Sequence, residues 1–367
     1  MKILLLIGGL IGLTLPAYAN DPYVIGENLV LKSEILGEDR PYIVHLPASY
    51  SDTTYQQRNY PVLYILDGSK HFLPAVGVIN HMSNPLNNAN LRIPELIVVA
   101  IKNTKDRTLD LTPTSSSYSP VENSTKQPPM GGGSVKFLQF IEKELIPEIE
   151  TKYRVLPHRT FVGHSFGGLT VLHSLLIQPG LFNNYIATDP SLWWDDKIML
   201  KWVQKFILEN KEKKARIFMS SADHEASDSF SSFINMTASN KFFYERLQKS
   251  QSGDLNVKFQ IFPGQDHGSV PLLGIYYGLI HGFNGYKLEM ETILAGVEVF
   301  SKHFKDYSER EGVKFLPTEH LVDMITTYMG NELSPDVVKD YLELNVRNYP
   351  DSVHAKAKLD EFLEKEK

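Results

Sequence analysis

The amino-acid sequence predicts an α/β fold, in which a mostly parallel central sheet has helices on both faces and a small helical extension follows. Three observations predict it. Apolar strand-like runs alternate with helical patterns between about residues 60 and 262, which is typical of repeated strand–helix units. A glycine-flanked turn at 163–168 joins one of these strands to an apolar helix. After about residue 290 the strand pattern stops and charged helical patterns remain.

The first segments predict two kinds of strand. Residues 28–36 and 42–46 read as strands on either side of a turn and predict an antiparallel pair. Residues 60–68 and 94–101 are short, mostly apolar runs, as expected of parallel strands buried on both faces. The polar stretch 103–133 predicts a long loop, and loops of this length inside a compact domain are usually functional or mobile.

Regular alternation follows this loop. A helix is predicted from Ser134, because its apolar residues fall on one face at helical spacing. Strand and helix patterns then alternate, which places the successive strands in one parallel sheet. The predicted strands are 159–163, 185–188, 215–220 and 257–262. The predicted helices between them are 169–177, 196–210 and 230–249.

The tail sets the predicted domain division. We expect a signal peptide at 1–19, a catalytic domain at 20–290 and a helical extension at 291–367. The clearest helix of the extension is 353–365. The tail shows no repeat of fixed period, so one or two helix hairpins are expected there.

Composition excludes several kinds of function. The chain has 367 residues, a formal net charge of -6 and no cysteine. Charges of both signs occur without a basic stripe, so nucleic acid is not an expected partner. Without cysteine, the chain has no disulfide, no thiolate metal ligand and no cysteine nucleophile.

The N-terminal segment predicts export. Lys2 is followed by an apolar run at 3–15 and then by the small-x-small sequence that ends at Ala19. The run is shorter than the ~20 residues that span a bilayer, which favours a signal peptide cleaved after Ala19 over a membrane anchor. No later segment is long and apolar enough to span. The mature protein is therefore expected to be periplasmic or secreted.

The strongest chemical motif is Gly163-His-Ser-Phe-Gly-Gly168, which lies between a predicted strand and a predicted helix. A serine hydroxyl is a weak nucleophile until a base activates it, and a tight strand-to-helix turn exposes it to that base. The flanking glycines leave room for the turn. The motif therefore predicts a nucleophile elbow with Ser165 as nucleophile, as in the α/β-hydrolase fold.

The base is expected to be His267. The α/β-hydrolase fold orders its catalytic residues serine, acid and histidine, so the base should follow the elbow in sequence. His267 lies on a glycine-flanked loop directly after the last core strand, from which it can reach Ser165. His173 lies within the helix after the elbow and is expected to be packed or solvated.

The acid is expected after the preceding strand, where the sequence offers Asp223 and Glu225. Either carboxylate could receive the imidazole N–H and stabilise the cation that forms. Asp266 is excluded, because it adjoins His267 and adjacent side chains on an extended loop point apart.

The oxyanion hole requires backbone N–H groups. The amide of Phe166, directly after the nucleophile, is one candidate. The second is expected from the loop after the strand 60–66, where Ser69 or Gly68 would donate it.

Trp193 and Trp194 lie near the carboxyl edge of the predicted sheet, and at least one is expected to line the substrate pocket. Rival chemistries find little support. The sequence has no His-Glu-x-x-His zinc helix, and the glycines at 131–133 lack the Lys that a phosphate-binding loop needs. Neither a metal nor a nucleotide is expected.

These segments resemble the putative esterase family of α/β-hydrolases, which includes esterase D-like enzymes, enterochelin (siderophore) esterases, feruloyl esterases and mycolyltransferases. The likeness covers about residues 30–282, most of the mature chain. The segments that carry it are Leu36–Arg40 with Tyr42–Pro47, Tyr60–Gly68, Asn103–Pro113, Gly163–Gly168, Asp189–Trp194 and the His267 loop.

The resemblance implies a carboxylic ester substrate, with no metal and no cofactor. By position it favours Glu225 over Asp223 as the acid, although some siderophore-esterase relatives look like Ser–His dyads. Arg107 and His164, together with the two tryptophans, are the expected substrate-binding residues. Similar exported esterases carry tetratricopeptide-like tails, and residues 348–363 look like a fragment of one, which would offer a surface to a protein partner.

The sequence thus predicts a serine carboxylic ester hydrolase that forms an acyl-enzyme on a small, siderophore-type or carbohydrate-type ester. Two alternatives use the same pocket. An acyltransferase would pass the acyl group from the same triad to a sugar or alcohol, and a non-catalytic binding module would only recognise a partner.

Overall fold

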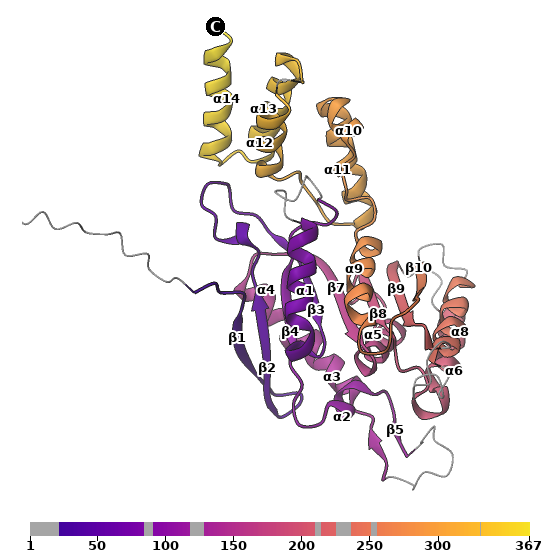
Figure 1. The fold of residues 1–367 in the computed structure, drawn as a ribbon. Helices are drawn as coiled ribbons and strands as arrows, with labels where there is room; N and C mark the ends of the chain where they lie inside the picture. Colours follow the sequence, from indigo (N-terminus) through magenta and orange to yellow (C-terminus); the bar gives the residue numbers. More distant parts are fainter. Residues whose placement is uncertain are drawn as a thin grey trace, which may run out of the picture.

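The computed structural model describes residues 22–83, 91–117, 128–209, 214–224, 236–250, 255–330 and 332–367. Within them, an eight-stranded sheet with strand order β1-β2-β4-β3-β7-β8-β9-β10 forms the centre of the molecule (Figure 1). The predicted signal peptide, 1–19, lies outside the described residues.

The sheet has the predicted mixture of strand directions. β1 pairs antiparallel with β2 and β2 pairs antiparallel with β4, whereas all the other neighbouring strands are parallel. The central strands β3, β4 and β8 are buried along their whole length, as their apolar sequences predict. The strands are β1 Glu27–Ser33, β2 Glu38–His45, β3 Tyr60–Ile65, β4 Ile97–Ile101, β7 Val155–His164, β8 Asn184–Thr188, β9 Ala215–Ala222 and β10 Leu255–Phe262.

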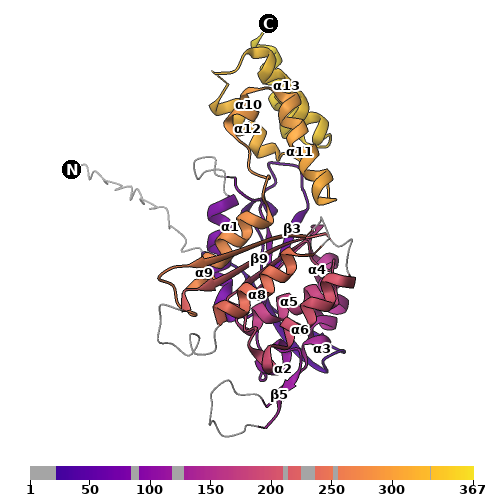
Figure 2. The same ribbon diagram turned by 90° about the vertical axis from the view of Figure 1, so that its right-hand side faces the viewer.

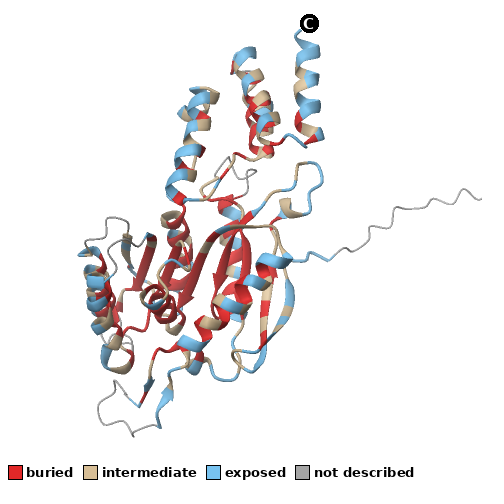
Figure 3. Cartoon of the chain, turned by 180° about the vertical axis from the view of Figure 1, so that it is seen from behind, coloured by how far each residue is buried: buried red, intermediate tan, exposed pale blue. Residues whose placement is uncertain are grey.

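Helices cover both faces of this sheet, and each face has its own apolar core. One core contains side chains of the segments α3 Ser134–Phe140, α4 Ile146–Lys152, α5 Phe166–Ile177, α6 Trp194–Glu209 and α8 Met236–Gln248. The other core contains side chains of α1 Gly68–Ser83 and α9 Val270–Gly282. Figure 3 shows the central strands as buried and the edge strand β1 as partly exposed. The α/β-hydrolase fold class is therefore confirmed.

The C-terminal helices lie beyond one end of the sheet (Figure 2). They are α10 Met290–Leu294, α11 Val297–Glu311, α12 Glu319–Tyr328, α13 Pro335–Asn348 and α14 Val353–Lys365. Phe304 and Tyr307 of α11 belong to the same apolar core as α1 and α9. The extension thus packs on the part of the chain that contains the sheet, through shared core residues. It lies at the end of the sheet opposite the short segment α2 Arg107–Leu111 (Figure 1).

A buried charge network joins the extension to the sheet at Glu311, the last residue of α11. Its Oε1 accepts hydrogen bonds from Arg216 Nη2 of β9 at 2.8 Å and from Arg310 Nε at 3.1 Å. Its Oε2 lies 3.6 Å from Nε2 of the buried His158 in β7. Burial raises the pKa of Glu311, but the nearby His158 and the hydrogen bond and charge of Arg216 outweigh burial and lower it to about 2.

The variant Glu311→Gln is expected to be less stable than wild type near neutral pH, by about 3 kcal/mol at most. The folded-state pKa lies below the ordinary value of 4.5, so this stability is present above pH 4.5 and is lost as the pH falls toward 2. Urea unfolding at pH 7 and pH 3 measures it, and the gap should narrow at pH 3. Glu309→Gln on the same helix removes only an exposed pair with Lys305 and should leave stability unchanged. Equal effects of the two variants would contradict the prediction.

Several elements differ from the sequence prediction. Helix α1 begins at Gly68, where only a loop was expected. The long loop 103–133 contains α2 and a two-stranded hairpin of β5 Ser115–Ser116 and β6 Met130–Gly131. The helix expected at 230–249 is α8, and residues 225–235 lie outside the described part of the chain. No helix of the described residues is long and apolar enough to cross a membrane.

Candidate active site

Strand register brings the reactive side chains to one edge of the sheet. His164 of β7 lies beside Thr188 of β8, and Thr188 lies beside Ser220 of β9. The next residues along these parallel strands, Ser165 and Asp189, are therefore neighbours at the carboxyl ends. This edge is where ligands bind in open α/β sheets.

The elbow has the strained backbone that its sequence predicts. Ser165 has φ 59 and ψ -119, a region that side-chain-bearing residues rarely occupy. Its N–H donates to Thr188 O of β8 at 3.1 Å, and its C=O accepts from Leu169 N in the first turn of α5 at 2.9 Å. The turn therefore holds the Ser165 hydroxyl at the N-terminus of α5.

Gly163 shows why glycine is required here. A Cβ at this position would lie 2.3 Å from the backbone of Gly167, and neither backbone segment can shift far enough to relieve the clash. Gly163→Ala is expected to destabilise the protein by at least about 2 kcal/mol and to abolish activity. Gly77→Ala in α1 is the matched control, because a Cβ there meets nothing within 4 Å and alanine favours a helix. Thermal unfolding compares them, and a wild-type melting temperature for Gly163→Ala would contradict the close approach.

Three side chains form a continuous hydrogen-bonded chain at this edge. His267 Nε2 lies 3.0 Å from Ser165 Oγ, and His267 Nδ1 lies 2.7 Å from Asp189 Oδ2. Because an ionised carboxylate only accepts hydrogen bonds, Nδ1 carries the proton and the Nε2 lone pair faces the serine. In this tautomer His267 can take the proton of Ser165, and the 34% exposure of its side chain leaves the pair accessible.

The predicted acid is corrected by this geometry. The carboxylate on His267 Nδ1 is that of Asp189, which follows β8, so the alternative acid Asp223 after β9 is wrong. Glu225 lies outside the described residues, and the bond it was expected to make is made by Asp189. Asp266 is exposed, and its carboxylate accepts hydrogen bonds from the amides of Gly268 and Ser269 in its own turn. This arrangement agrees with the exclusion of Asp266 as the acid.

The hydrogen-bonded triad contains a buried charged carboxylate, and a buried neutral imidazole packs beside it. Burial raises the pKa of Asp189, but hydrogen bonds from His224 and His267 outweigh it and lower the pKa to about 2. Burial lowers the pKa of His164 to about 3, so this imidazole is neutral near pH 7. The ring centroids of His164 and His267 are 4.4 Å apart. His164 is thus buried against His267, which corrects its expected role in contacting substrate.

The oxyanion candidates lie where two turns meet. Phe166 is the first residue of α5 and Gly68 is the first residue of α1, so Phe166, Gly68 and Ser69 all stand at helix N-termini. The turns are close, since a Cβ on Gly167 would lie 3.2 Å from Asp67 Oδ2 and 3.4 Å from Leu66 Cβ. Helix N-termini stabilise negative charge, so these amides stay candidates for the oxyanion hole.

Asp67 fixes the turn before α1 and positions Arg107. It has φ 55, and its carboxylate accepts from Arg107 Nε at 2.5 Å, from Arg107 Nη2 at 2.8 Å and from Asn103 Nδ2 at 2.6 Å. The guanidinium lies 5.5 Å from the ring centroid of Phe166 and its side chain is 32% exposed. Arg107 therefore stands beside the elbow with a face toward solvent, as a substrate-contacting residue requires.

The two tryptophans differ. Trp194 is buried, and its indole N–H donates to Thr114 O at 3.1 Å, so it packs the hairpin end instead of lining a pocket. Trp193 is half-buried and its ring lies 5.8 Å from that of Phe166. Trp193 is therefore the better candidate for substrate contact.

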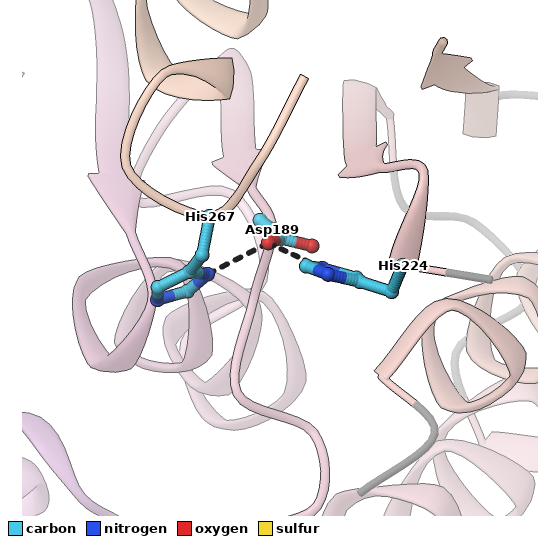
Figure 4. A group of neighbouring side chains, drawn as sticks. All are labelled: Asp189, His224 and His267. Atoms are coloured by element: carbon cyan, nitrogen blue, oxygen red, sulfur yellow. Dashed lines mark hydrogen bonds and ion pairs between the residues drawn. The ribbon is translucent and has the colours of Figure 1, made fainter. Parts of the chain in front are cut away.

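Among the described residues, one group of side chains could in principle hold a metal ion: Asp189, His224 and His267 (Figure 4). Their potential ligand atoms all lie within 4.8 Å of one another. Both imidazoles place a ring nitrogen 2.7 Å from the same carboxylate oxygen, Asp189 Oδ2. A cation there would have to replace both N–H donors. The hydrogen-bonded arrangement satisfies all three groups by itself.

Comparisons with known proteins agree with this geometry. The sequence matches the family described as "Putative esterase" over residues 33–267. It is 32% identical over 240 residues to the ferri-bacillibactin esterase BesA of Bacillus subtilis, a match that covers 64% of this chain and 81% of that protein. It is 30% identical over 184 residues to a siderophore enterobactin esterase of Emericella nidulans, covering 46% of this chain and 60% of that protein.

A solved structure extends the similarity beyond the residues that match the family. The crystal structure of an IroE-like serine hydrolase from Shewanella oneidensis superposes with a TM-score of 0.75 at 29% sequence identity. The match covers 88% of this chain and 99% of that chain. Because the sheet and its covering helices end near residue 282, coverage this large must include part of the C-terminal extension.

Proposed function

The chain belongs to the putative esterase family and is an ester hydrolase, and from this premise we propose that it cleaves siderophore-type esters through an acyl-enzyme on Ser165. One observation carries the mechanism: Ser165 Oγ, His267 and Asp189 are linked by hydrogen bonds of 3.0 and 2.7 Å. The names of two relatives, a ferri-bacillibactin esterase and a siderophore enterobactin esterase, support the substrate class.

In the proposed first step, His267 Nε2 takes the proton of Ser165 while Oγ attacks the ester carbonyl carbon. The resulting imidazolium is stabilised by Asp189. The amide of Phe166, with that of Ser69 or Gly68, holds the negative oxygen. His267 then gives the proton to the alcohol as it leaves. A water molecule next attacks the acyl carbon while His267 Nε2 takes its proton, and His267 returns that proton to Ser165 Oγ as the free acid leaves.

Residues beside the elbow support recognition of a substrate that is aromatic or anionic. Trp193 and Arg107 both lie against Phe166, on opposite sides of the reactive turn in sequence. A flat ring can stack on the indole. The guanidinium donates to Asp67 through Nε and Nη2, and we propose that its remaining N–H groups donate to carboxylate or carbonyl oxygens of the substrate. We propose these two side chains as the substrate-binding residues.

An ester panel tests the substrate class. Enterobactin, a feruloyl ester, an acetylated sugar and p-nitrophenyl butyrate are compared by kcat/KM, and the siderophore ester is expected to be the best substrate by at least about tenfold. Preference for another ester would reject the siderophore assignment. Product analysis with an added acceptor alcohol separates the enzyme from an acyltransferase, because hydrolysis yields free acid as the main product.

A fluorophosphonate probe tests the mechanism independently of the substrate. It is expected to label the folded protein at a single serine, Ser165, found by peptide mass spectrometry. A folded protein that stays unlabelled would favour a non-catalytic binding module and reject the acyl-enzyme.

We also propose that the protein is exported, on the strength of the charged start, apolar run and Ala-x-Ala ending of residues 1–19. The intact mass of the protein recovered outside the cytoplasm should correspond to a chain that begins at Asn20. A recovered chain that still starts at Met1 would reject cleavage.

A further inference from the structure

A second imidazole contacts the carboxylate that His267 uses. His224 follows β9, and its Nε2 lies 2.7 Å from Asp189 Oδ2, the oxygen that also lies 2.7 Å from His267 Nδ1 (Figure 4). The two ring centroids are 6.3 Å apart, with the carboxylate between the rings. His224 is buried, with 2% of its side chain exposed, whereas His267 is partly open to solvent. The proposed reaction assigns no role to His224.

The protonation of His224 follows from its partner. An ionised carboxylate offers only lone pairs, so His224 Nε2 must carry a hydrogen and donate it. The other oxygen of Asp189, Oδ1, accepts from Ser221 Oγ at 2.9 Å. Asp189 is fully buried and depends on these donors to stay ionised. Oδ2 therefore divides its negative charge between two N–H donors.

The backbone of Asp189 also needs support. Its φ is 44, in the left-handed region that costs a side-chain-bearing residue roughly 1 kcal/mol or more. Its N–H donates to Ser220 O at 2.8 Å, which fixes the backbone but leaves the side-chain torsion free. Ser221 and His224, both from the end of β9, hold the two carboxylate oxygens.

We propose that His224 is a positioning residue for this reaction: its Nε2–H holds Asp189 Oδ2 in line with His267 Nδ1 and takes up part of the carboxylate's charge. This inference rests on the proposed serine mechanism. Holding the carboxylate keeps His267 in the tautomer and orientation that serve Ser165. Sharing the charge limits how strongly the imidazolium of His267 is stabilised.

Other titratable groups face this network. His164 of β7 packs on His267, and His71 of α1 packs on His164 at 5.6 Å between ring centroids. Burial lowers the pKa of His71 to about 4 and that of His164 to about 3, so both rings are neutral near pH 7. The charge of Lys70 in α1 interacts electrostatically with His164, and Asp266 interacts electrostatically with His267 on the same loop. None of these groups donates a hydrogen bond to Asp189 in the described structure.

The test compares His224→Leu with His224→Gln. Leucine removes the donor, and the glutamine amide can still donate near the position of Nε2. For leucine, kcat should fall at least about tenfold, the effect of losing one buried hydrogen bond to a charged acceptor, while KM stays within about twofold. The acidic limb of its pH–kcat/KM profile should move to higher pH, because Asp189 then stabilises the imidazolium of His267 more strongly. Glutamine should restore most of both.

A buried histidine outside the network serves as the matched control. His173 of α5 lies 2.7 Å from Ser134 Oγ through its Nδ1, so His173→Gln is expected to alter stability without moving the pH profile. A leucine variant of His224 with wild-type kcat and pH profile would overturn the proposal. Equal impairment of the leucine and glutamine variants would also overturn it, since that result assigns His224 to packing alone.

Proton NMR keeps the proposal testable if the leucine variant does not fold. Wild type should show two low-field N–H resonances, from His267 Nδ1 and His224 Nε2, and His224→Gln should lose only the second. A wild-type spectrum without a His224 N–H resonance would overturn the proposal. Fluorophosphonate labelling separates this result from the mechanism: an unlabelled wild type rejects the proposed function, whereas the resonances still report on His224 and Asp189.

Discussion

Ser165→Ala should lower kcat for ester hydrolysis by at least about a thousandfold and leave the fold intact. The methyl side chain cannot attack the carbonyl, and the residual rate comes from binding and the oxyanion hole alone. Because alanine has a Cβ as serine does, the substitution leaves the backbone strain of the turn at φ 59 about the same. Thermal unfolding and initial rates on the best ester of the panel measure the two effects.

A matched serine separates chemistry from general damage. Ser51→Ala alters an exposed serine that follows the short helical turn Ala48–Tyr50 before β3, at the other end of the sheet from the elbow. It should keep wild-type turnover. Ser191 is not a suitable control, because its Oγ lies 3.1 Å from Ser165 Oγ. Activity of Ser165→Ala above about one per cent of wild type would exclude Ser165 as the nucleophile.

The second large effect is expected for Asp189→Asn, at about 10³- to 10⁴-fold in kcat. The neutral amide cannot stabilise the imidazolium. Its NH₂ group can also face His267 Nδ1, which would turn the wrong nitrogen of the ring toward Ser165. Because hydrogen bonds hold the pKa of Asp189 at about 2, the wild-type carboxylate stays charged throughout the neutral range. Steady-state kinetics and fluorophosphonate labelling rates should fall together.

Three carboxylates provide the comparison for Asp189. Asp223→Asn and Glu225→Gln change the acids that the sequence favoured, and Asp266→Asn changes the neighbour of His267. Each should keep activity within a few-fold of wild type, because His267 Nδ1 is bonded to Asp189. A loss for Glu225→Gln as large as that for Asp189→Asn would return the acid to the position that the sequence indicated.

The pairing of Ser165 with His267 could be predicted because local sequence determines the geometry of both residues. The strained turn at Ser165 needs glycine at 163, where a Cβ would meet backbone at 2.3 Å, and this need is visible as a motif. His267 needs only a loop after the last core strand, and the hydrogen-bonding distance to Ser165 Oγ agrees with that placement. Both residues lie at strand ends that the apolar pattern marks.

The acid could not be chosen by position in the chain, because two strands end near His267. The expected strand, β9, ends directly before Asp223, and its neighbour β8 ends directly before Asp189. Register provides the missing signal: Thr188 pairs with His164, so Asp189 comes level with Ser165. The expected order of serine, acid and histidine along the sequence is kept, since Asp189 also lies between Ser165 and His267.

The sequence by itself determined the alternation of strands and helices, the mixed strand directions and the Ser165–His267 pair, because each follows from short-range periodicity or a single turn. Only the tertiary structure decided what meets across elements: Asp189 rather than Asp223 on His267, His164 beneath the base, Trp194 in the packing, and α11 joined to the sheet through Glu311 and Arg216. The physical reason is that the local sequence around a carboxylate or an aromatic ring does not identify the side chain that it contacts in the folded protein. That partner is set by strand register and by which donors are buried beside it.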